Sequence, residues 1–363
     1  MSIRMARNAF ALVGAGALLL AGAACGTGAD GSADDGRPTV VTAVYPLQWL
    51  AERVAGDRAE VANLVEPGVE AHDVELTPRQ VGELGQAAVV FYIAGMSPAV
   101  DDAVAQEAPD TALDAQTLTD PLAPAEEEGG EHADEHAEEE GHTHEGEEPA
   151  HEEGHTDEAE HAHEGEAEHA HEGEAEHAHE GEGEAGHDHA HEGADPHLWL
   201  DPTRMGPLAE GLAERLSEAD PEGAETYAAN AQAVADETTA LDEEFTTALE
   251  GCAADTIVTS HTAFGYLADR YGLHQVGIAG LSPDTEPSPA RMAEVAEIAE
   301  HEGVSTVFTE TTVSPEVAQT LADEIGVSTA VLNTLEGGPT EGGDYLSTMR
   351  ENLAALTGAL DCG

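Results

Sequence analysis

The segment TIVTSHTAFGYLADRYGLHQVGI, residues 256–278, decides the fold class of this chain. It begins with a β-branched run at 256–259, continues through a helical stretch at 263–271 and ends in a second short run at 274–278. A strand, a helix and a strand of these lengths predict a βαβ unit, in which helices cover parallel strands. The alternation recurs along the chain, so we expect an α/β protein.

Two series of such elements are predicted, and one long helix separates them. In residues 39–220 we expect strands at 39–44, 60–65, 88–94 and 111–115, and helices at 46–55, 77–86 and 98–107. In residues 251–363 we expect strands at 256–259, 274–278, 305–309 and 328–332, and helices at 263–271, 289–302, 315–325 and 345–360. Unbroken helical spacing at 221–250 predicts a linking helix between two lobes.

The first 25 residues have the pattern of an export signal. A basic start precedes an apolar stretch that is short for a membrane span, and small residues then lead to Cys25. This is the arrangement of a lipoprotein cleavage site, so we expect Cys25 to carry the lipid anchor and residues 26–38 to form a flexible tether. The alternative is an ordinary secreted protein with an unmodified Cys25.

A tract at 126–194 carries fifteen of the chain's 20 histidines, together with many acidic residues. Its centre repeats almost perfectly: HAHEGEAE at 161–168 and 169–176, then HAHEGEGE at 177–184. The tract has few apolar residues, so packing cannot offset the entropy that it would lose on ordering. We therefore predict a disordered insertion. Imidazole and carboxylate both bind zinc, which favours a metal-collecting loop over the alternative of a solvated acidic linker.

The charge of the chain limits its partners. The formal net charge is −65, with 11 basic residues against 76 acidic ones. Nucleic acid is therefore excluded as a partner, because phosphate binding needs cationic side chains. An anionic membrane surface would repel the protein, so attachment must come from the lipid, whereas cations would be attracted.

Cys252 and Cys362 remain once the signal segment is set aside. Outside the cytosol such a pair favours a disulfide, although two unpaired buried thiols stay an alternative.

Three of the five histidines outside the tract lie where a predicted strand ends or a loop begins: His72, His197 and His261. Ligands of open α/β sheets bind beyond the carboxyl ends of strands. Three imidazoles meeting there would suit zinc, with a carboxylate or water in the fourth position. We interpret His274 and His301 as surface or packing residues.

Three aspartates, Asp73, Asp195 and Asp201, lie close enough in sequence to orient the imidazoles by hydrogen bonds to their far nitrogens.

At these residues the chain resembles the zinc- and manganese-binding solute-binding lipoproteins of bacterial ABC importers. The matching motifs are Tyr-Pro-Leu at 45–47, His-Asp-Val-Glu-Leu-Thr-Pro at 72–78, Asp-Pro-His-Leu-Trp-Leu-Asp-Pro at 195–202, His-Thr-Ala-Phe-Gly-Tyr at 261–266, Phe-Thr-Glu at 308–310 and Gly-Asp-Tyr at 343–345. The resemblance covers 39–363 and implies two four-stranded parallel-sheet lobes joined by one long helix, with the metal between them.

The resemblance assigns His72, His197 and His261 as ligands. A histidine at 261, where the manganese branch has glutamate, implies zinc rather than Mn²⁺, as does a histidine-rich insertion. Members of the family often have an aspartate metal ligand in the second lobe. This chain departs from that pattern, because its matching stretch is LNTLEG at 332–337. The fourth ligand is then water, Asn333 through its carbonyl oxygen, or Glu336.

The leading hypothesis from the sequence is therefore a monomeric, non-enzymatic receptor on the outer face of the cell membrane that captures zinc and delivers it to a membrane ABC permease. Two alternatives stay open. A zinc hydrolase would also use three histidines and water, but no accompanying catalytic motif is present. In a passive metal buffer the tract would be the whole function.

Overall fold

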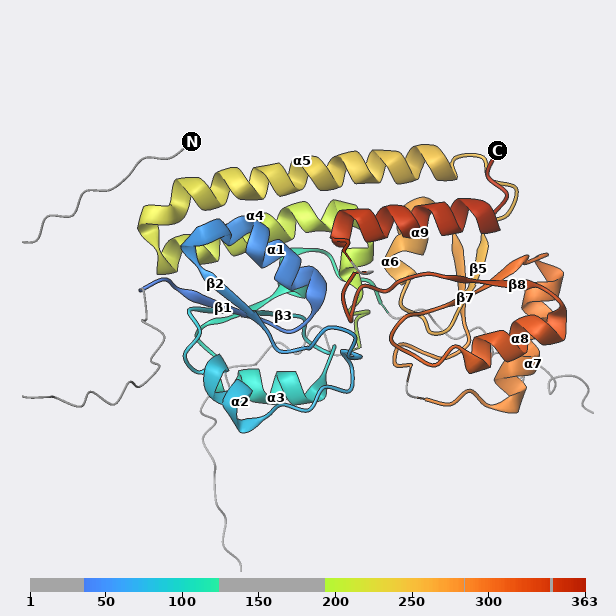
Figure 1. The fold of residues 1–363 in the computed structure, drawn as a ribbon, viewed down its shortest axis with the longest axis horizontal. Coiled ribbons are helices and arrows are strands. Elements are labelled where there is room, and N and C mark those ends of the chain that lie inside the picture. The colour runs from blue at the N-terminus through green and yellow to red at the C-terminus, as the bar shows by residue number, and fades with distance from the viewer. Residues whose placement is uncertain (1–35, 124–192, 284, 340–341) are drawn as a thin grey trace, which may run out of the picture. The chain divides into compact units, whose positions relative to one another are not determined.

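Two four-stranded parallel sheets form the frame of the computed structural model, which describes residues 36–123, 193–283, 285–339 and 342–363 (Figure 1). Their strand orders are β2-β1-β3-β4 and β6-β5-β7-β8, so the two sheets repeat one topology. The predicted α/β fold with two four-stranded sheets is confirmed. The described residues from Pro38 onward form a single compact unit.

The first sheet comes from residues before the histidine-rich tract. Valines pair across its centre, with Val40 of β1 opposite Val61 of β2 and Val89 of β3. Pro46, Pro78 and Pro98 each stand in the first turn of a helix, where the missing N–H has no intrahelical partner to lose. The elements are β1 (Thr39–Thr42), α1 (Tyr45–Ala55), η1 (Gly56–Arg58), β2 (Glu60–Asn63), α2 (Pro78–Leu84), β3 (Val89–Tyr92), α3 (Pro98–Glu107), β4 (Ala112–Asp114) and η2 (Ala115–Leu118).

The second sheet follows the same plan. Gly272 and Gly326 end two of its helices with φ values of 68° and 75°, a left-handed conformation that glycine adopts at little cost. The elements are β5 (Thr256–Thr259), α6 (Gly265–Tyr271), β6 (His274–Gly277), α7 (Pro289–His301), β7 (Thr306–Thr309), α8 (Glu316–Ile325), β8 (Ser328–Val331) and α9 (Tyr345–Ala359).

The connection between the sheets contains two long helices. After η3 (Leu198–Leu200), α4 (Pro202–Ala219) packs along the 26-residue α5 (Ala224–Leu249), with η4 (Pro221–Gly223) between them. The expected linking helix is α5, about 39 Å long at 1.5 Å per residue. Helix α4 was not predicted, because Gly206, Pro207 and Gly211 weaken its helical signal.

Arginines join α5 to helices of both sheets. Arg53 of α1 pairs with Glu237, and Arg350 of α9 pairs with Glu244 through two bonds of 2.7 and 2.9 Å. Arg270 of α6 donates two hydrogen bonds, of 2.8 and 2.6 Å, to the buried Asp242 of α5. The apolar face of α5 lies in one continuous core cluster that includes residues of both sheets, so the lobes share packing as well as ion pairs.

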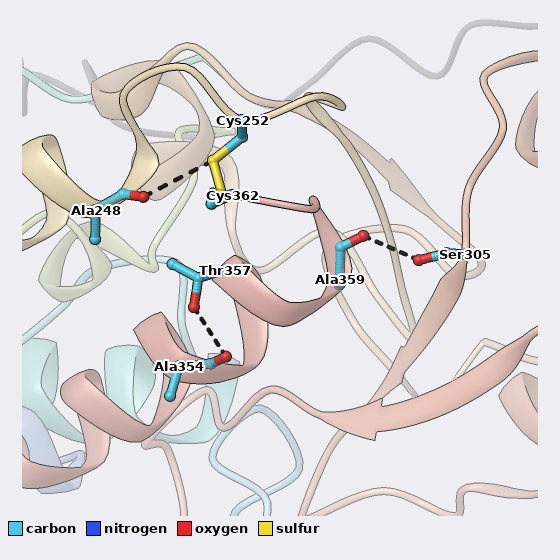
Figure 2. Close-up of a disulfide and its surroundings, with 7 residues drawn as sticks. All are labelled: Ala248, Cys252, Ser305, Ala354, Thr357, Ala359 and Cys362. Atoms are coloured by element: carbon cyan, nitrogen blue, oxygen red, sulfur yellow. Dashed lines mark hydrogen bonds between the residues drawn. A yellow bond between two sulfur atoms is a disulfide. The ribbon is translucent and has the colours of Figure 1, made fainter.

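A disulfide joins Cys252, just after α5, to Cys362, just after α9 (Figure 2). Nearby, the Ser305 hydroxyl donates a hydrogen bond of 2.9 Å to the carbonyl of Ala359, near the end of the same helix. The disulfide closes a loop with a sequence separation of 110 residues, which contains the whole second sheet.

No helix among the described residues is long and apolar enough to span a membrane. Cys25, the signal at 1–25 and nearly all of the tether at 26–38 and of the tract at 126–194 lie outside the described residues. The boundaries of the lobes at 39–220 and 251–363 stay predictions.

Replacing both Cys252 and Cys362 by serine should lower the free energy of unfolding by about 2–5 kcal/mol, because the unfolded chain regains the freedom that the long closed loop removes. Denaturant titration of the metal-free protein measures the change. The wild-type protein under reducing conditions should unfold like the double variant. Equal midpoints for oxidised and reduced wild type would contradict the expectation.

Candidate metal centre

Three imidazoles and one carboxylate meet where loops from both sheets converge. His72 follows β2, His197 precedes η3, His261 follows β5 and Glu336 follows β8. The Nε2 atoms of His72 and His197 lie 3.2 Å apart. Glu336 Oε1 lies 3.3 Å from Nε2 of His197 and 3.6 Å from Nε2 of His261. One donor atom from each residue falls within 4.8 Å of all the others, a grouping that could hold a metal ion.

His197 and His261 each have one carboxylate beside Nδ1, Asp195 through a hydrogen bond and Glu310 through a close ion-pair contact. Asp195 Oδ1 accepts from the backbone N–H of His197 at 2.9 Å and lies 2.8 Å from its Nδ1. Glu310, at the end of β7, accepts from the backbone N–H of His261 at 3.1 Å and lies 2.7 Å from its Nδ1. Each carboxylate thus fixes the ring and turns Nε2 toward the centre, as outer partners do at zinc sites.

His72 is supported differently. Its backbone N–H donates to Glu70 Oε2 at 3.0 Å, and no carboxylate hydrogen bond to its ring is seen among the described residues. It is also the one partly exposed member of the group, whereas the other three are buried. His72 therefore has the weakest support and the most contact with solvent.

Of the three alternatives for the fourth donor, water, Asn333 and Glu336, the structure places Glu336 beside the imidazoles. The Oδ1 atom of Asn333 accepts from the backbone N–H of Leu335 at 2.7 Å. The main chain of Asn333 is held by the Asn352 side chain of α9 through bonds of 2.8 and 2.7 Å. Asn333 is thus occupied within its own loop, and the carboxylate of Glu336, which the sequence left open as an alternative, points to the imidazoles.

The turn at 333–336 explains this exchange of roles. Leu335 adopts φ 66°, a left-handed conformation that branched and bulky side chains rarely take. The hydrogen bond from its N–H to Asn333 stabilises that conformation, and the next residue, Glu336, is turned inward to 1% exposure. Asn333 is therefore a positioning residue for Glu336. A sequence pattern cannot show this, because it does not contain the backbone angle.

Main-chain contacts fasten the loop of Glu336 to loops of the first lobe. The N–H of Gly68 donates to the carbonyl of Gly337 at 2.7 Å. A Cβ at Gly337 would lie 2.6 Å from Thr312 Cγ2 and 3.2 Å from Gly68 Cα, so the approach requires glycine. On the other side, Trp199 Nε1 donates to the carbonyl of Thr334 at 2.8 Å.

The donor set fits a divalent cation. Neither carboxylate oxygen of Glu336 has a hydrogen-bond donor of conventional geometry among the described residues, although both are buried. A buried carboxylate without such donors is costly unless a cation compensates it. Three ring nitrogens and one carboxylate oxygen match the ligand types and number that zinc takes in four-coordinate sites.

The carboxylates also set the pKa values of the rings. Burial by itself would lower the pKa of His197, but the neighbouring carboxylates of Asp195 and Glu336 outweigh burial and raise it to about 9. Burial likewise opposes protonation of His261, yet Glu310 and Glu336 raise its pKa to about 10. The two rings in turn hold the pKa of Glu336 well below its usual range, against the effect of burial.

His72 shifts in the opposite direction. Burial, reinforced by the neighbouring charge of His197, lowers its pKa to about 4. In the metal-free protein at neutral pH, His197 and His261 are therefore protonated, Glu336 is ionised and His72 is neutral. A bound dication would take the place of two protons.

The other residues singled out in the sequence lie elsewhere. Asp201 caps α4, accepting from the N–H of Thr203 at 2.9 Å, and Asp73 is exposed. His274 and His301 are exposed, and His301 pairs with Glu302 at 2.9 Å. Of the three aspartates proposed to orient imidazoles, only Asp195 does so.

Glu310 was missed as a partner of His261. The signal that could have found it was its place directly after a strand, at the edge where His261 also lies.

The fold and this cluster define a two-lobed α/β protein with a buried centre suited to a metal ion. Residues 40–359 match the family described as "Zinc-uptake complex component A periplasmic", and the chain belongs to that family.

Two relatives and one solved structure illustrate the likeness. The chain is 33% identical over 349 residues to the "High-affinity zinc uptake system protein ZnuA" of Bacillus subtilis (strain 168), covering 93% of each. It is 33% identical over 340 residues to the "Zinc-binding lipoprotein AdcA" of Streptococcus pneumoniae serotype 4, covering 90% of this chain but only 56% of that relative. The crystal structure of the Zn(II)-bound ZnuA-like domain of Streptococcus pneumoniae AdcA matches with a TM-score of 0.62 and 29% identity, covering 90% of this chain and 100% of that one.

Zinc binding at pH 7.5 should release about two protons per ion, because the pKa values of His197 and His261 lie above that pH and a metal binds only the neutral ring. His72 is already neutral and should contribute none. Between pH 6.5 and 8.5 the apparent affinity should therefore rise about a hundredfold for each pH unit.

Calorimetry in two buffers with different ionisation enthalpies counts these protons, using a chain without residues 126–192 so that the tract does not contribute. His261→Ala should release about one proton fewer if it still binds the metal. Release of less than one proton by the unsubstituted centre would contradict the protonation states described above.

Proposed function

We propose that this protein is an extracytoplasmic zinc receptor that captures the ion in its buried centre and delivers it to a membrane ABC permease. The observation that carries the proposal is the convergence of donor atoms from His72, His197, His261 and Glu336 within 4.8 Å. The donors come from loops of both sheets, so one ion would bridge the two lobes. Membership of the zinc-uptake family supports the same role.

The donor chemistry favours zinc over Mn²⁺. Manganese prefers oxygen ligands and higher coordination numbers, whereas imidazole suits zinc. Here three of the four donors are ring nitrogens. The carboxylates behind His197 and His261 would make those rings more basic and so stronger donors.

The geometry favours carriage over catalysis. A zinc hydrolase keeps one coordination position open for water, with a general base beside it. In this centre the fourth position has its own donor, Glu336, which is 1% exposed. A receptor needs such a closed set, because its task is to hold the ion and release it unchanged.

The proposal places the protein outside the cytoplasm, as a monomer anchored to the outer face of the membrane. Its basis is the export pattern of residues 1–25 and the position of Cys25, which would carry the lipid. A tethered receptor stays close to its permease, which raises the effective concentration at which the two meet.

Substitution within the centre tests the ligand assignment. In a chain without residues 126–192, His197→Ala, His261→Ala and Glu336→Gln should each weaken zinc binding by more than about a hundredfold, beyond the usual cost of changing an outer partner. Asn333→Ala should cost only about tenfold, because it loosens the turn but removes no ligand. Competition with a chelator of known affinity measures all four.

His301→Ala is the matched control, because its ring is exposed and, within the described part of the chain, pairs with Glu302. Its affinity should equal that of the parent chain. If His261→Ala or Glu336→Gln bound zinc as tightly as this control, the centre would not be the zinc site and the passive-buffer account would gain support.

The tract has a separate test. Because its composition is that of a weak zinc collector, deletion of residues 126–192 should slow growth under zinc limitation and leave growth in zinc-replete medium unchanged. The strain should depend on this receptor for zinc, and His261→Ala provides the comparison for complete loss. Equal growth of the deleted and full-length strains at limiting zinc would remove the scavenging role.

A further inference from the structure

The two segments that flank residues 124–192 contact each other beside the metal centre. The N–H of Asp195, after the segment, donates to the carbonyl of Leu122, before it, at 3.0 Å. The hydroxyl of Tyr266, from α6, bridges the same two residues. It accepts from the N–H of Leu122 at 2.9 Å and donates to the carbonyl of Asp195 at 3.0 Å.

Neighbouring groups hold this bridge in place. Tyr266 is 1% exposed, and the Arg204 guanidinium lies 4.4 Å from the centre of its ring. Arg204 also donates to the carbonyl of Asp120, on the departing side. A Cβ at Gly265 would lie 2.6 Å from Asp195 Oδ2, so the start of α6 presses directly against Asp195. The contact between the two flanking segments is thus held by several groups, and the Tyr266 hydroxyl lies between the segments.

The same Asp195 orients a proposed zinc ligand. The carbonyl of Asp195 accepts a hydrogen bond from the Tyr266 hydroxyl. Its carboxylate is hydrogen-bonded to both the backbone N–H and the Nδ1 of His197. Tyr266, Asp195 and His197 therefore act in series, from a helix of the second lobe to the metal centre. A displacement at either end of residues 124–192 would reach His197 through Asp195 unless something else absorbed it.

We propose that Tyr266 is a positioning residue for His197, and that its hydroxyl keeps the metal centre independent of whatever residues 124–192 bind. The bridge ties the two ends of that segment to each other and to α6, so a pull on either end is resisted by the second lobe before it reaches Asp195. This inference rests on the proposed zinc centre.

A double-mutant cycle tests the proposal. Tyr266→Phe removes only the bridging hydroxyl, and it is made in the full chain and in a chain whose residues 124–192 are replaced by a short Gly-Ser link. Chelator competition at no more than one equivalent of zinc reports the tightest site. In the full chain Tyr266→Phe should weaken it about tenfold, as loss of an outer partner does. In the shortened chain the loss should be clearly smaller, by more than the roughly twofold scatter of independent substitutions.

Two readouts separate positioning from general packing. The Nδ1–H signal of His197 in ¹⁵N-imidazole spectra should broaden or shift with Tyr266→Phe in the full chain and stay in place in the shortened chain. Tyr271→Phe is the matched control, because its hydroxyl, from the same helix, donates to Asp242 of α5 at 3.1 Å and not to Asp195. It should leave both the affinity and the signal unchanged.

The unsubstituted protein gives a further test, should Tyr266→Phe fail to fold. With the bridge intact, the full and shortened chains should bind zinc at the centre with affinities equal within about twofold. A larger difference would overturn the proposal, as would equal losses for Tyr266→Phe in the two chains. If His261→Ala left the affinity unchanged, the zinc centre itself would fail, whereas loss of affinity in His261→Ala without coupling in the cycle would overturn this inference alone.

Discussion

The interaction on which the centre depends is that of one buried carboxylate, Glu336, with two imidazoles that outer carboxylates hold in place. Removing a carboxylate from water is costly, and in this protein the charges of His197 and His261 compensate it. The compensation works only while both rings face inward, which Asp195 and Glu310 ensure. Three carboxylates and two protonated rings thus form one network, in which a divalent ion can replace two protons without exposing any member to solvent.

The two sheets make this network possible. Because all their strands are parallel, the carboxyl ends of each sheet lie along one edge. His72 follows β2, while His261 and Glu310 follow the neighbouring strands β5 and β7. The helix α5 joins both lobes through apolar packing and arginine pairs, so the edges that carry the donors are held opposite each other. The centre is therefore a product of topology first and of individual side chains second.

Much of this could be predicted from the sequence, and the exceptions have physical reasons. The alternation of strands and helices predicted the two sheets, and the three loop histidines were named before any geometry was known. The helix α4 was missed because glycines and a proline weaken its local signal, although packing on α5 forms it. The sequence left water, Asn333 and Glu336 open as the fourth donor, because the left-handed angle of Leu335, which turns Glu336 inward, is a three-dimensional property. The pairing of Glu310 with His261 depends on which strands are neighbours, and composition does not contain that information.

The position of the disulfide has a consequence for the order in which the protein matures. Cys252 precedes the whole second sheet and Cys362 follows its last helix. A chain exported as proposed emerges from its amino end, and domains fold as units in that order. The first sheet can therefore complete its hydrogen bonds while the second is still being delivered, but the sulfurs cannot meet until the last helix has crossed. Oxidation then comes late, so the disulfide cannot guide the folding of the first sheet.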